Sequence, residues 1–539
     1  MGDFRLNRRT ALIAVGAGAG VLASSPAYAA EESGTITPPT PVPDPSTQTL
    51  AQRFISQQQF VIAHRGAGDV NPEHTAYAYQ QAILKGAQAI EISVRSTVDG
   101  ELVCMHDNAL SRTTTQKSGY VSSTTLADVK RAMIDMRPFL GSGTPLQNIV
   151  TLDEALDLIA ATPTGGAYGS SGPNTIFFLE AKDSAAQLKI LDVMTRRGLV
   201  GQTVIKMYRN GAGGFDPNAG FAKYAKDAGF LTWCYFDAGD AATSINAMAQ
   251  SANVDLIGLP YFETVLDRNY ASMSDYKVRQ VVAMGKPVIM WEIHRRSAME
   301  HFASLGVRGF MSPDPYWLSG GSMAADLKLT TARRQHGMLP AGQQDVANMP
   351  VWENGALIHR QTYDESIMLG PLTPLAQSYP SYVLYFTMKW EDLLPTTNWQ
   401  YGYIAFGRQT DAPFGLGGKH AVTNNNGCYV LAIRPKADAM DENGKYVNGD
   451  MIQLLRIDNG TNNPVPVKTL YPKQGFAPNK DINGKIIVRP DSITIDVAGA
   501  RSEAIADTAY RGPYMHFGRY HDNSTGGGLA LSNVTAYRL

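Results

Sequence analysis

Histidine and arginine side chains follow short apolar segments near the start of the chain, where their types favour proton and phosphate chemistry. His64 and Arg65 end one such segment, and His106 ends another. Imidazole titrates near neutral pH, so a pair of histidines can accept and donate protons during a reaction. The planar guanidinium of arginine holds two phosphate oxygens at once. Together these residues predict a site that cleaves a phosphodiester, with His64 and His106 as the catalytic pair and Arg65 on the phosphate.

Acidic residues at the ends of two further apolar segments are candidates for binding a hard cation. Glu91 and Glu180 occupy these positions, and oxygen ligands of this kind are those that Ca²⁺ and Mg²⁺ prefer. Lys182 lies two residues beyond Glu180, on the same side of an extended chain, from where it can reach the phosphate. Trp291 ends a later segment, where it serves either substrate contact or packing at the mouth of the site. The set predicts metal-assisted chemistry.

Eight short apolar segments alternate with helical stretches between residues 50 and 318, a pattern typical of a parallel sheet. They are Phe60–His64, Ala87–Ser93, Thr175–Glu180, Val204–Met207, Phe230–Tyr235, Leu256–Leu259, Pro287–Trp291 and Gly309–Ser312. Eight is the number of strands that closes a (β/α)8 TIM barrel, whose chemistry sits at the carboxyl ends of its strands. The predicted fold class is therefore α/β for this part of the chain.

The segment after the second predicted strand departs from the regular alternation. Glu101–His106 reads as an extra strand, and its separation from Ser93 is too short for a helical crossover. The extra strand carries His106 towards the barrel mouth. Residues 108–148 then form a long insertion, which we expect to act as a loop over the site.

The composition changes after the predicted barrel. Residues 319–345 form a polar linker, and from 346 to 539 apolar residues recur with a period of two between turn signals, as in Tyr382–Trp390. This pattern predicts an all-β sandwich. Its last segments resemble the closing strands of a concanavalin-like or laminin-G-like jelly roll, a lectin-like fold, so a cell-wall glycan is a candidate partner for this domain.

The first 29 residues predict an export signal. The pair Arg8-Arg9 precedes an apolar run, and Ala27-Tyr28-Ala29 forms a small-x-small cleavage site. The paired arginines resemble a twin-arginine signal, with an ordinary secretory signal as the alternative. Residues 30–49 are rich in Pro and Thr and predict a flexible leader. We therefore expect a secreted protein or one held in the cell envelope.

Charge and cysteine content exclude several classes of partner. The net charge of -1 does not suit a nucleic-acid-binding protein. No stretch after the signal reaches the roughly 18 apolar residues of a membrane span, so none is expected. Cys104, Cys234 and Cys428 are too few and too scattered for a disulfide framework, and the first two fall in predicted strands, where we expect them to be buried.

The motifs around these residues resemble, in order along the chain, those of the glycerophosphodiester phosphodiesterase family. The matching segments are His64-Arg65-Gly66, Asn71-Pro72-Glu73-His74-Thr75, Glu91-Ile92-Ser93-Val94, Asp99-Gly100-Glu101-Leu102-Val103, His106-Asp107, Leu110-Ser111-Arg112-Thr113-Thr114, Thr151–Leu156, Leu179-Glu180-Ala181-Lys182, Trp291, Gly306-Val307 and Ser312-Pro313-Asp314-Pro315. Each segment alone is a weak signal, but the ordered set is specific.

The resemblance implies a barrel enzyme that hydrolyses glycerophosphodiesters to an alcohol and glycerol 3-phosphate, usually with Ca²⁺ or Mg²⁺. Glu73 matches a carboxylate that orients its neighbours. His64 and His106 match the general acid/base pair. Arg65 and Lys182 match phosphate contacts. Glu91 and Glu180 match metal ligands. The substrate is expected to be a deacylated phospholipid head group or a glycerol-phosphate wall polymer.

One departure from the family pattern bears on the metal. The pattern is Glu-x-Asp, and Ser93 stands at the position of the second carboxylate. Fewer charged ligands weaken binding of an oxygen-ligated cation. Asp107 or Asp183 is a candidate replacement. A smaller departure is His74, where the family often has Asn.

Two other functions fit the same residues. The first is a phospholipase D-like lyase on the same barrel, which would release a cyclic phosphate. The second is a non-catalytic protein that has lost its metal and binds a glycan or a wall polymer. Ser93 motivates the second, whereas retention of both histidines, Arg65 and Lys182 argues against it.

Overall fold

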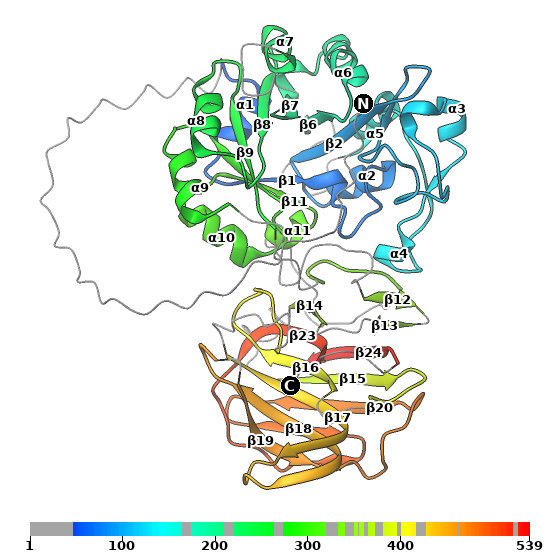
Figure 1. Cartoon of the computed structure of the whole chain (residues 1–539), viewed down its shortest axis with the longest axis vertical. Coiled ribbons are helices and arrows are strands. Elements are labelled where there is room, and N and C mark those ends of the chain that lie inside the picture. The colour runs from blue at the N-terminus through cyan, green and yellow to red at the C-terminus, as the bar shows by residue number, and fades with distance from the viewer. Residues whose placement is uncertain are drawn as a thin grey trace, which may run out of the picture. The chain divides into compact units, whose positions relative to one another are not determined.

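The structure is a computed structural model, drawn in Figure 1. It describes residues 47–163, 174–209, 220–262, 273–319, 332–339 and 350–539; the last range lacks 354, 361–364, 372–380, 396–399, 417–426, 462 and 521–526. The predicted export signal and most of the predicted leader fall in residues 1–46, outside the described residues. Most of the predicted linker, 319–345, lies outside them as well.

Eight parallel strands close into a barrel, which confirms the predicted (β/α)8 fold. They are β1 (Phe60–Ala63), β2 (Ala89–Ser96), β6 (Ile176–Ala181), β7 (Thr203–Tyr208), β8 (Leu231–Tyr235), β9 (Leu256–Pro260), β10 (Val288–Trp291) and β11 (Gly309–Ser312). Successive strands are neighbours in the sheet, and β1 pairs with both β2 and β11, which closes the ring. The predicted extra strand is β3 (Leu102–Cys104), which runs antiparallel to β2.

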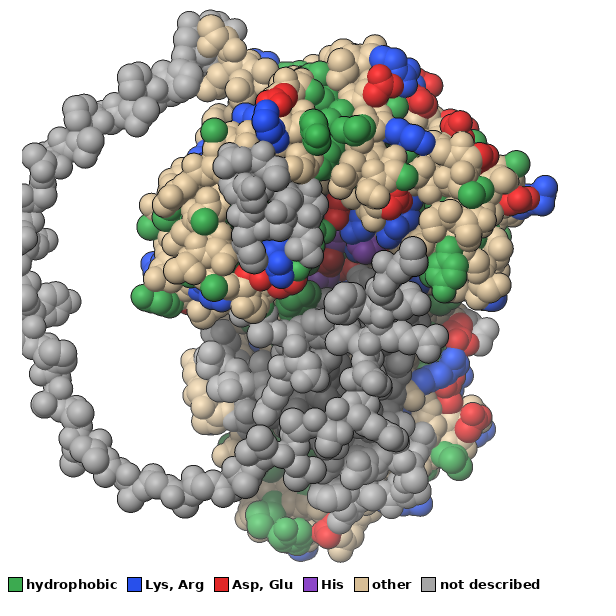
Figure 2. Space-filling view, turned by 45° about the horizontal axis from the view of Figure 1, so that its top comes forward, with side chains coloured by type: hydrophobic (Ala, Val, Ile, Leu, Met, Phe, Trp, Pro, Cys, Tyr) green, Lys and Arg blue, Asp and Glu red, His purple; other side chains and the backbone are tan. Residues whose placement is uncertain are grey.

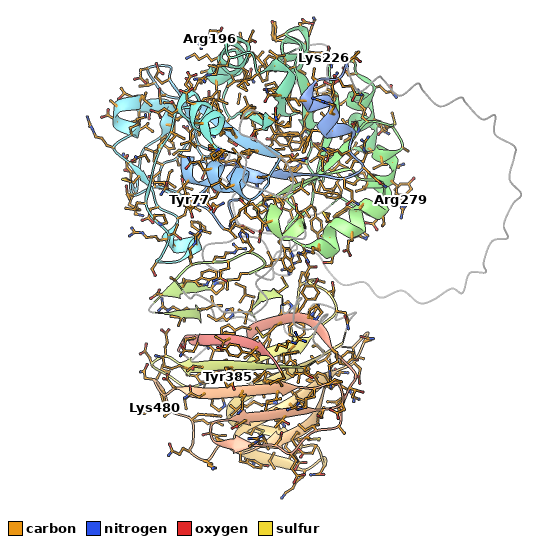
Figure 3. All side chains as sticks on the ribbon, turned by 180° about the vertical axis from the view of Figure 1, so that it is seen from behind. Tyr77, Arg196, Lys226, Arg279, Tyr385 and Lys480 are labelled. Atoms are coloured by element: carbon orange, nitrogen blue, oxygen red, sulfur yellow. The ribbon has the colours of Figure 1, made fainter. Side chains whose placement is uncertain are left out.

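Helices surround the strands (Figure 1). Those of the barrel are α1 (Leu50–Ser56), α2 (Ala76–Leu84), α5 (Leu152–Ala161), α6 (Ser184–Arg196), α7 (Phe221–Asp227), α8 (Ala242–Gln250), α9 (Asp275–Val282), α10 (Arg296–Ser304) and α11 (Pro315–Leu318). Several begin at a side chain that accepts a hydrogen bond from the first turn, such as Thr75 for α2, Thr151 for α5 and Asp183 for α6. Arg196 and Arg279 mark the outer faces of α6 and α9 (Figure 3).

The interior of the barrel changes from apolar to polar along the strands. Phe178 on β6 and Val204 on β7 belong to a buried apolar cluster that fills the interior. Side chains two residues apart share a side of a strand, so Glu180 and Lys206 follow Phe178 and Val204 towards the carboxyl ends. The apolar layer therefore forms a floor beneath a charged layer, which is where TIM barrels place their sites.

The insertion between β3 and α5, which we predict to act as a loop over the site at residues 108–148, contains short elements of secondary structure. It contains a 3-10 turn at Val121–Ser123, the helices α3 (Leu126–Val129) and α4 (Arg137–Leu140), and the paired strands β4 (Met133–Ile134) and β5 (Gln147–Asn148). Its apolar side chains form a cluster of their own. Because these residues follow neither a helical nor a strand period over any length, pattern analysis overlooks them.

The second half of the chain is all β, as predicted. One sheet has the strand order β12-β13-β24-β15-β20-β21-β22 and the other β14-β23-β16-β17-β18-β19, both with antiparallel pairing. Apolar side chains of both sheets share one core, as in a sandwich. The bounds are β12 (Val351–Glu353), β13 (Ala356–His359), β14 (Glu365–Pro371), β15 (Tyr382–Trp390), β16 (Tyr401–Gly407), β17 (Cys428–Met440), β18 (Tyr446–Ile457), β19 (Pro464–Leu470), β20 (Ile482–Val488), β21 (Ile493–Val497), β22 (Ala500–Arg501), β23 (Gly512–Tyr520) and β24 (Leu529–Arg538). The lectin-like subtype stays a prediction.

The three cysteines are buried and unpaired, as predicted for Cys104 and Cys234, and Cys428 shares that state. Burial raises the pKa of each thiol to about 12, so all three are protonated and unreactive at neutral pH. Within the described part of the chain, no helix is both long and apolar enough to cross a membrane.

His74 makes the stability of the barrel depend on pH, which an asparagine at the same position would not do. Its backbone is left-handed, with φ of 56°, a conformation that is uncommon for residues other than glycine. Burial is the largest cause that lowers the pKa of His74, to about 4, although Glu91 and Glu73 oppose it. The unfolded chain therefore binds this proton more readily, so the associated stability is complete above about pH 6.5 and is lost as the pH falls towards 4.

We predict that His74→Asn will flatten this dependence. At pH 5, keeping the His74 imidazole neutral lowers the free energy of unfolding by about 2 kcal/mol. This pH lies about 1.5 units below the pKa of histidine in the unfolded chain, and each unit is worth about 1.4 kcal/mol. Urea midpoints at pH 7.5 and pH 5 measure the effect. The exposed His301, changed to Asn, is the control and should keep the wild-type dependence. If the urea midpoint changes equally between pH 7.5 and pH 5 in wild type and in His74→Asn, the pH dependence does not come from His74.

Candidate active site

Charged side chains gather at the carboxyl ends of the barrel strands. The space-filling view shows a hollow there in which basic, acidic and histidine side chains meet (Figure 2). Contacts within this charged layer join five of the residues predicted from the sequence, namely His64, Arg65, Glu91, Glu180 and Lys182. His106 is linked to Arg65 through Asp107, Arg112 and Glu73.

The His64–Gly66 turn directly follows β1 and presents His64 and Arg65 to the hollow. Arg65 and Gly66 are both left-handed, with φ of 55° and 78°. A Cβ on Gly66 would lie 2.8 Å from the Cβ of Ala78, so only glycine fits beneath the turn. The backbone N–H of Arg65 donates to Oε2 of Glu91, at 3.1 Å. Glu91 therefore fixes the strained turn that carries both residues.

His64 is enclosed and neutral. Its Nε2 accepts a hydrogen bond from Nε of Arg65, at 3.3 Å, and its Nδ1 lies 3.4 Å from Oε1 of Glu292. Burial, followed by the charges of Arg65 and Lys206, holds the pKa of His64 well below its usual value. An imidazole in this state can accept a proton, and Glu292 stands ready to stabilise the imidazolium that forms.

His106 has a similar arrangement with a closer carboxylate. Its Nδ1 lies 2.7 Å from Oδ1 of Asp107, and its backbone oxygen accepts a hydrogen bond from Nε of Arg95. Burial and the charge of Arg65 lower the pKa of His106 to about 3, although the Asp107 contact opposes them. Nδ1 is thus bound to a carboxylate, which leaves Nε2 as the atom for proton transfer.

Glu73 joins the β1 turn to the segment that carries His106. It accepts hydrogen bonds from Nη1 of Arg65, at 3.1 Å, and from Nη2 of Arg112, at 2.6 Å. Arg112 also donates through Nε to Asp107, at 2.5 Å. Burial opposes ionisation of Glu73, but the two guanidinium groups outweigh it and lower its pKa. This chain of contacts supports the orienting role that the resemblance implies for Glu73.

Lys206 lies between the two acidic residues that the sequence predicts as metal ligands. Its Nζ is 3.1 Å from Oε1 of Glu91 and 2.8 Å from Oε2 of Glu180. Nζ of Lys182 lies 2.9 Å from Oε1 of Glu180, and the hydroxyl of Tyr235 donates to the same oxygen at 2.6 Å. Both carboxylates are therefore already bound by cationic and hydroxyl donors.

Mutual attraction keeps these three groups charged despite their burial. Burial alone would lower the pKa of Lys206, but Glu180 and Glu91 raise it above its usual value. Burial likewise opposes ionisation of Glu180 and Glu91, and Lys206 is the largest of the charges that lower the pKa of each. The result is a buried ion network that is charged at neutral pH.

These residues do not fit a divalent cation as they are arranged. Ca²⁺ and Mg²⁺ need several oxygen ligands within about 2.0–2.6 Å, and the ammonium of Lys206 occupies the space between the two carboxylates. Among the residues that the structure describes, no three His, Cys, Asp or Glu side chains are arranged to hold a metal ion. The metal-binding roles of Glu91 and Glu180 stay predictions.

The proposed replacements for the missing carboxylate are engaged elsewhere. Asp107 binds His106 and Arg112. Asp183 accepts hydrogen bonds from the backbone N–H groups of Ala186, at the start of α6, and of Ser96.

Trp291 stands at the edge of the charged layer. Its ring centroid is 5.4 Å from that of Tyr235 and 5.9 Å from that of Phe262, and its indole N–H is buried with no hydrogen-bond partner among the described residues. The structure thus places Trp291 beside the site, and its contact with substrate stays a prediction. Its neighbour Glu292 lies between His64 and His294, and sequence reasoning overlooked it.

Part of the chain is similar in sequence to a known family. Residues 64–166 match the sequence model of the Glycerophosphoryl diester phosphodiesterase family.

Several individual members of this phosphodiesterase family are similar to parts of the chain. The Mycobacterium tuberculosis protein named "probable glycerophosphodiester phosphodiesterase 1" is 48% identical over 82 residues, which is 15% of this chain and 30% of that protein. Glycerophosphodiester phosphodiesterase of Bacillus subtilis is 38% identical over 104 residues, 18% of this chain and 34% of that protein. The chain therefore spans about a third of the length of these relatives. The crystal structure of glycerophosphodiester phosphodiesterase from Agrobacterium tumefaciens covers 49% of this chain and 99% of its own, at 18% identity and a TM-score of 0.35.

We predict that Arg112→Met will raise the pKa of His106. Arg112 neutralises Asp107, and without it the full charge of that carboxylate would act on the imidazole. Proton NMR of selectively labelled histidines across pH 3–8 measures the titration. The exposed His301, paired with Asp275, is the internal control. A titration of His106 that moves to lower pH would show that Arg112 does not act through Asp107.

Proposed function

We propose that the protein is an exported phosphodiesterase whose barrel hydrolyses glycerophosphodiesters to an alcohol and glycerol 3-phosphate. The observation that carries this proposal is the meeting of two neutral, carboxylate-backed histidines with an arginine and a lysine at the carboxyl ends of the barrel strands. The family match over residues 64–166 supports it. Export rests on the predicted signal in the first 29 residues.

The side chains divide the reaction between charge and proton transfer. Arg65 and Lys182 bind the non-bridging oxygens of the phosphate and neutralise the charge that develops on them. One histidine accepts the proton of the attacking hydroxyl while the oxygen forms its bond to phosphorus. The other gives a proton to the departing alcohol oxygen as its bond to phosphorus breaks. The bound phosphodiester anion raises the pKa of both imidazoles, so one of them can carry the proton to be donated.

We predict that His64→Ala and His106→Ala will each lower turnover of glycerophosphocholine by at least about a hundredfold, since proton transfer is worth 10²–10⁴-fold. His301→Ala serves as the control, because His301 is exposed and pairs with Asp275 on the outer helices. Circular dichroism confirms that each variant is folded. Wild-type turnover in either site variant would remove that histidine from the mechanism.

The product distinguishes a hydrolase from the lyase alternative on the same barrel. A substrate hydroxyl that attacks phosphorus yields a cyclic phosphate, which a hydrolase then opens with water and a lyase releases. Phosphorus NMR of the reaction separates the two, because the cyclic diester and glycerol 3-phosphate give distinct signals. Accumulation of the cyclic product as the end point would favour the lyase.

The β-sandwich offers a surface for the proposed glycan or wall-polymer partner. Trp390, Tyr401 and Tyr403 are buried in its core, so they are not that surface. Tyr385 on β15 and Tyr537 on β24 are exposed neighbours, with ring centroids 6.1 Å apart. Exposed aromatic rings present apolar faces with a hydroxyl at the edge, which suits sugar rings. Tyr385 lies on the sandwich in Figure 3.

We predict that Tyr385→Ala with Tyr537→Ala will reduce cosedimentation of the protein with insoluble cell-wall polysaccharide by several-fold. Tyr446→Ala, at an exposed tyrosine elsewhere in the sandwich, is the matched control and should bind as wild type does. If the double variant and the control sediment alike, the tyrosine pair is not the binding surface.

A further inference from the structure

The ammonium of Lys206 occupies the place where Glu91 and Glu180 would coordinate a cation. Both carboxylates have an oxygen within 3.1 Å of Nζ; Glu91 lies on β2 and Glu180 on β6, and Lys206 lies on the adjacent strand β7. A metal ion bound to the same oxygens would lie within about 2.6 Å of them, so it would overlap the ammonium. The two cations exclude one another from this position.

The residue that departs from the family pattern is a register neighbour of this network. Ser93 on β2 pairs with Glu180 on β6, and Glu180 pairs with Lys206 on β7, so the three form one row across the sheet. Oγ of Ser93 donates to Oε1 of Glu91, at 3.0 Å, the same oxygen that Lys206 binds. A neutral donor at position 93 therefore satisfies Glu91 and adds no negative charge beside the ammonium.

The two arrangements carry the same formal charge. In the family pattern, the two carboxylates of Glu-x-Asp and the carboxylate of a further Glu surround one divalent cation. That arrangement has a net charge of minus one. Glu91 and Glu180 with one ammonium, Lys206, also have a net charge of minus one. Loss of the carboxylate at Ser93 and gain of the lysine thus balance in formal charge. Lys182 is common to both arrangements.

The surroundings of Lys206 enclose a permanent cation. The residue is 5% exposed, and its Nζ lies 5.4 Å from the ring centroids of both Trp233 and Tyr235. Aromatic faces stabilise a desolvated ammonium, in addition to the two carboxylates. The position therefore has the features of a built cation site whose occupant is a side chain.

We propose that the Lys206 ammonium replaces the divalent cation of this barrel, and that phosphodiester cleavage here is independent of Ca²⁺ and Mg²⁺. The second half of this statement rests on the proposed phosphodiesterase function. Lys206 acts as a positioning residue: it holds Glu91, which binds the backbone of Arg65 and lies 4.0 Å from Nε2 of His64. It also holds Glu180, which binds Lys182.

Two variants test the proposal by restoring room and charge for a metal. Lys206→Met removes the ammonium with little change in side-chain volume, and Ser93→Asp with Lys206→Ser recreates the three-carboxylate arrangement. Lys277→Met is the matched control, because Nζ of Lys277 binds the backbone oxygens of Ala238 and Asp240. Calorimetry with CaCl₂ and with MgCl₂ measures binding to the full mature chain. Thermal unfolding with and without each salt provides a second readout that needs no substrate.

We expect no binding of either cation by wild type or Lys277→Met at millimolar concentration. The two Lys206 variants should bind at least about tenfold more tightly than this millimolar limit. Their unfolding temperatures should rise with added cation, whereas the wild-type temperature should not. Wild-type turnover of glycerophosphocholine should survive EDTA, and any turnover by the double variant should be lost in it.

Submillimolar binding of either cation by wild type that Glu91→Gln abolishes would overturn the proposal. So would failure of both Lys206 variants, shown to be folded, to gain binding. The binding measurements decide the question even if no phosphodiester is turned over, so failure of the proposed function and failure of this inference give different results.

Discussion

The buried ion network of Glu91, Lys206 and Glu180 is the constraint on which the rest of the site depends. Removing a charge from water costs several kcal/mol per ion, so each of these groups is tolerable only while its partners are present. The network ties together β2, β6 and β7 in the charged layer of the barrel. Through Glu91 it also reaches the turn after β1, because the Arg65 N–H is bound to that carboxylate. Four strands are thus aligned by one cluster of charges.

A second set of contacts extends this order to the second histidine, His106. Glu73 binds Arg65 on one side and Arg112 on the other, and Arg112 binds Asp107 beside His106. The insertion that carries Arg112 has an apolar cluster of its own, so it supplies this guanidinium from a folded support. His64 and His106 are carried by separate segments of the chain. The distance between them is therefore set by the ion pairs that join these segments. These pairs are partly buried, so salt screens them less than it screens exposed pairs.

Much of the barrel follows directly from the sequence, because its strands are short apolar runs and its helices begin at recognisable caps such as Thr75 and Thr151. The residues at the ends of those runs were correctly expected to meet, since parallel strands expose their carboxyl ends at one mouth. Lys206 was missed, although a lysine inside the run 203–208 was a visible signal of a buried partner. Glu292 was missed because its relation to His64 arises only when β10 closes the ring beside β11 and β1. The fold of the insertion was missed because its contacts are local and irregular.

An ammonium on the chain differs from a bound metal in more than its origin. It delivers one unit of charge through directed N–H groups and has no empty orbital with which to polarise a phosphoryl oxygen or acidify water. Under the proposed function, a barrel built around Lys206 does without Lewis acidity and draws more of its rate from its histidines and guanidinium. In exchange, the positive charge between Glu91 and Glu180 is put in place when the polypeptide folds.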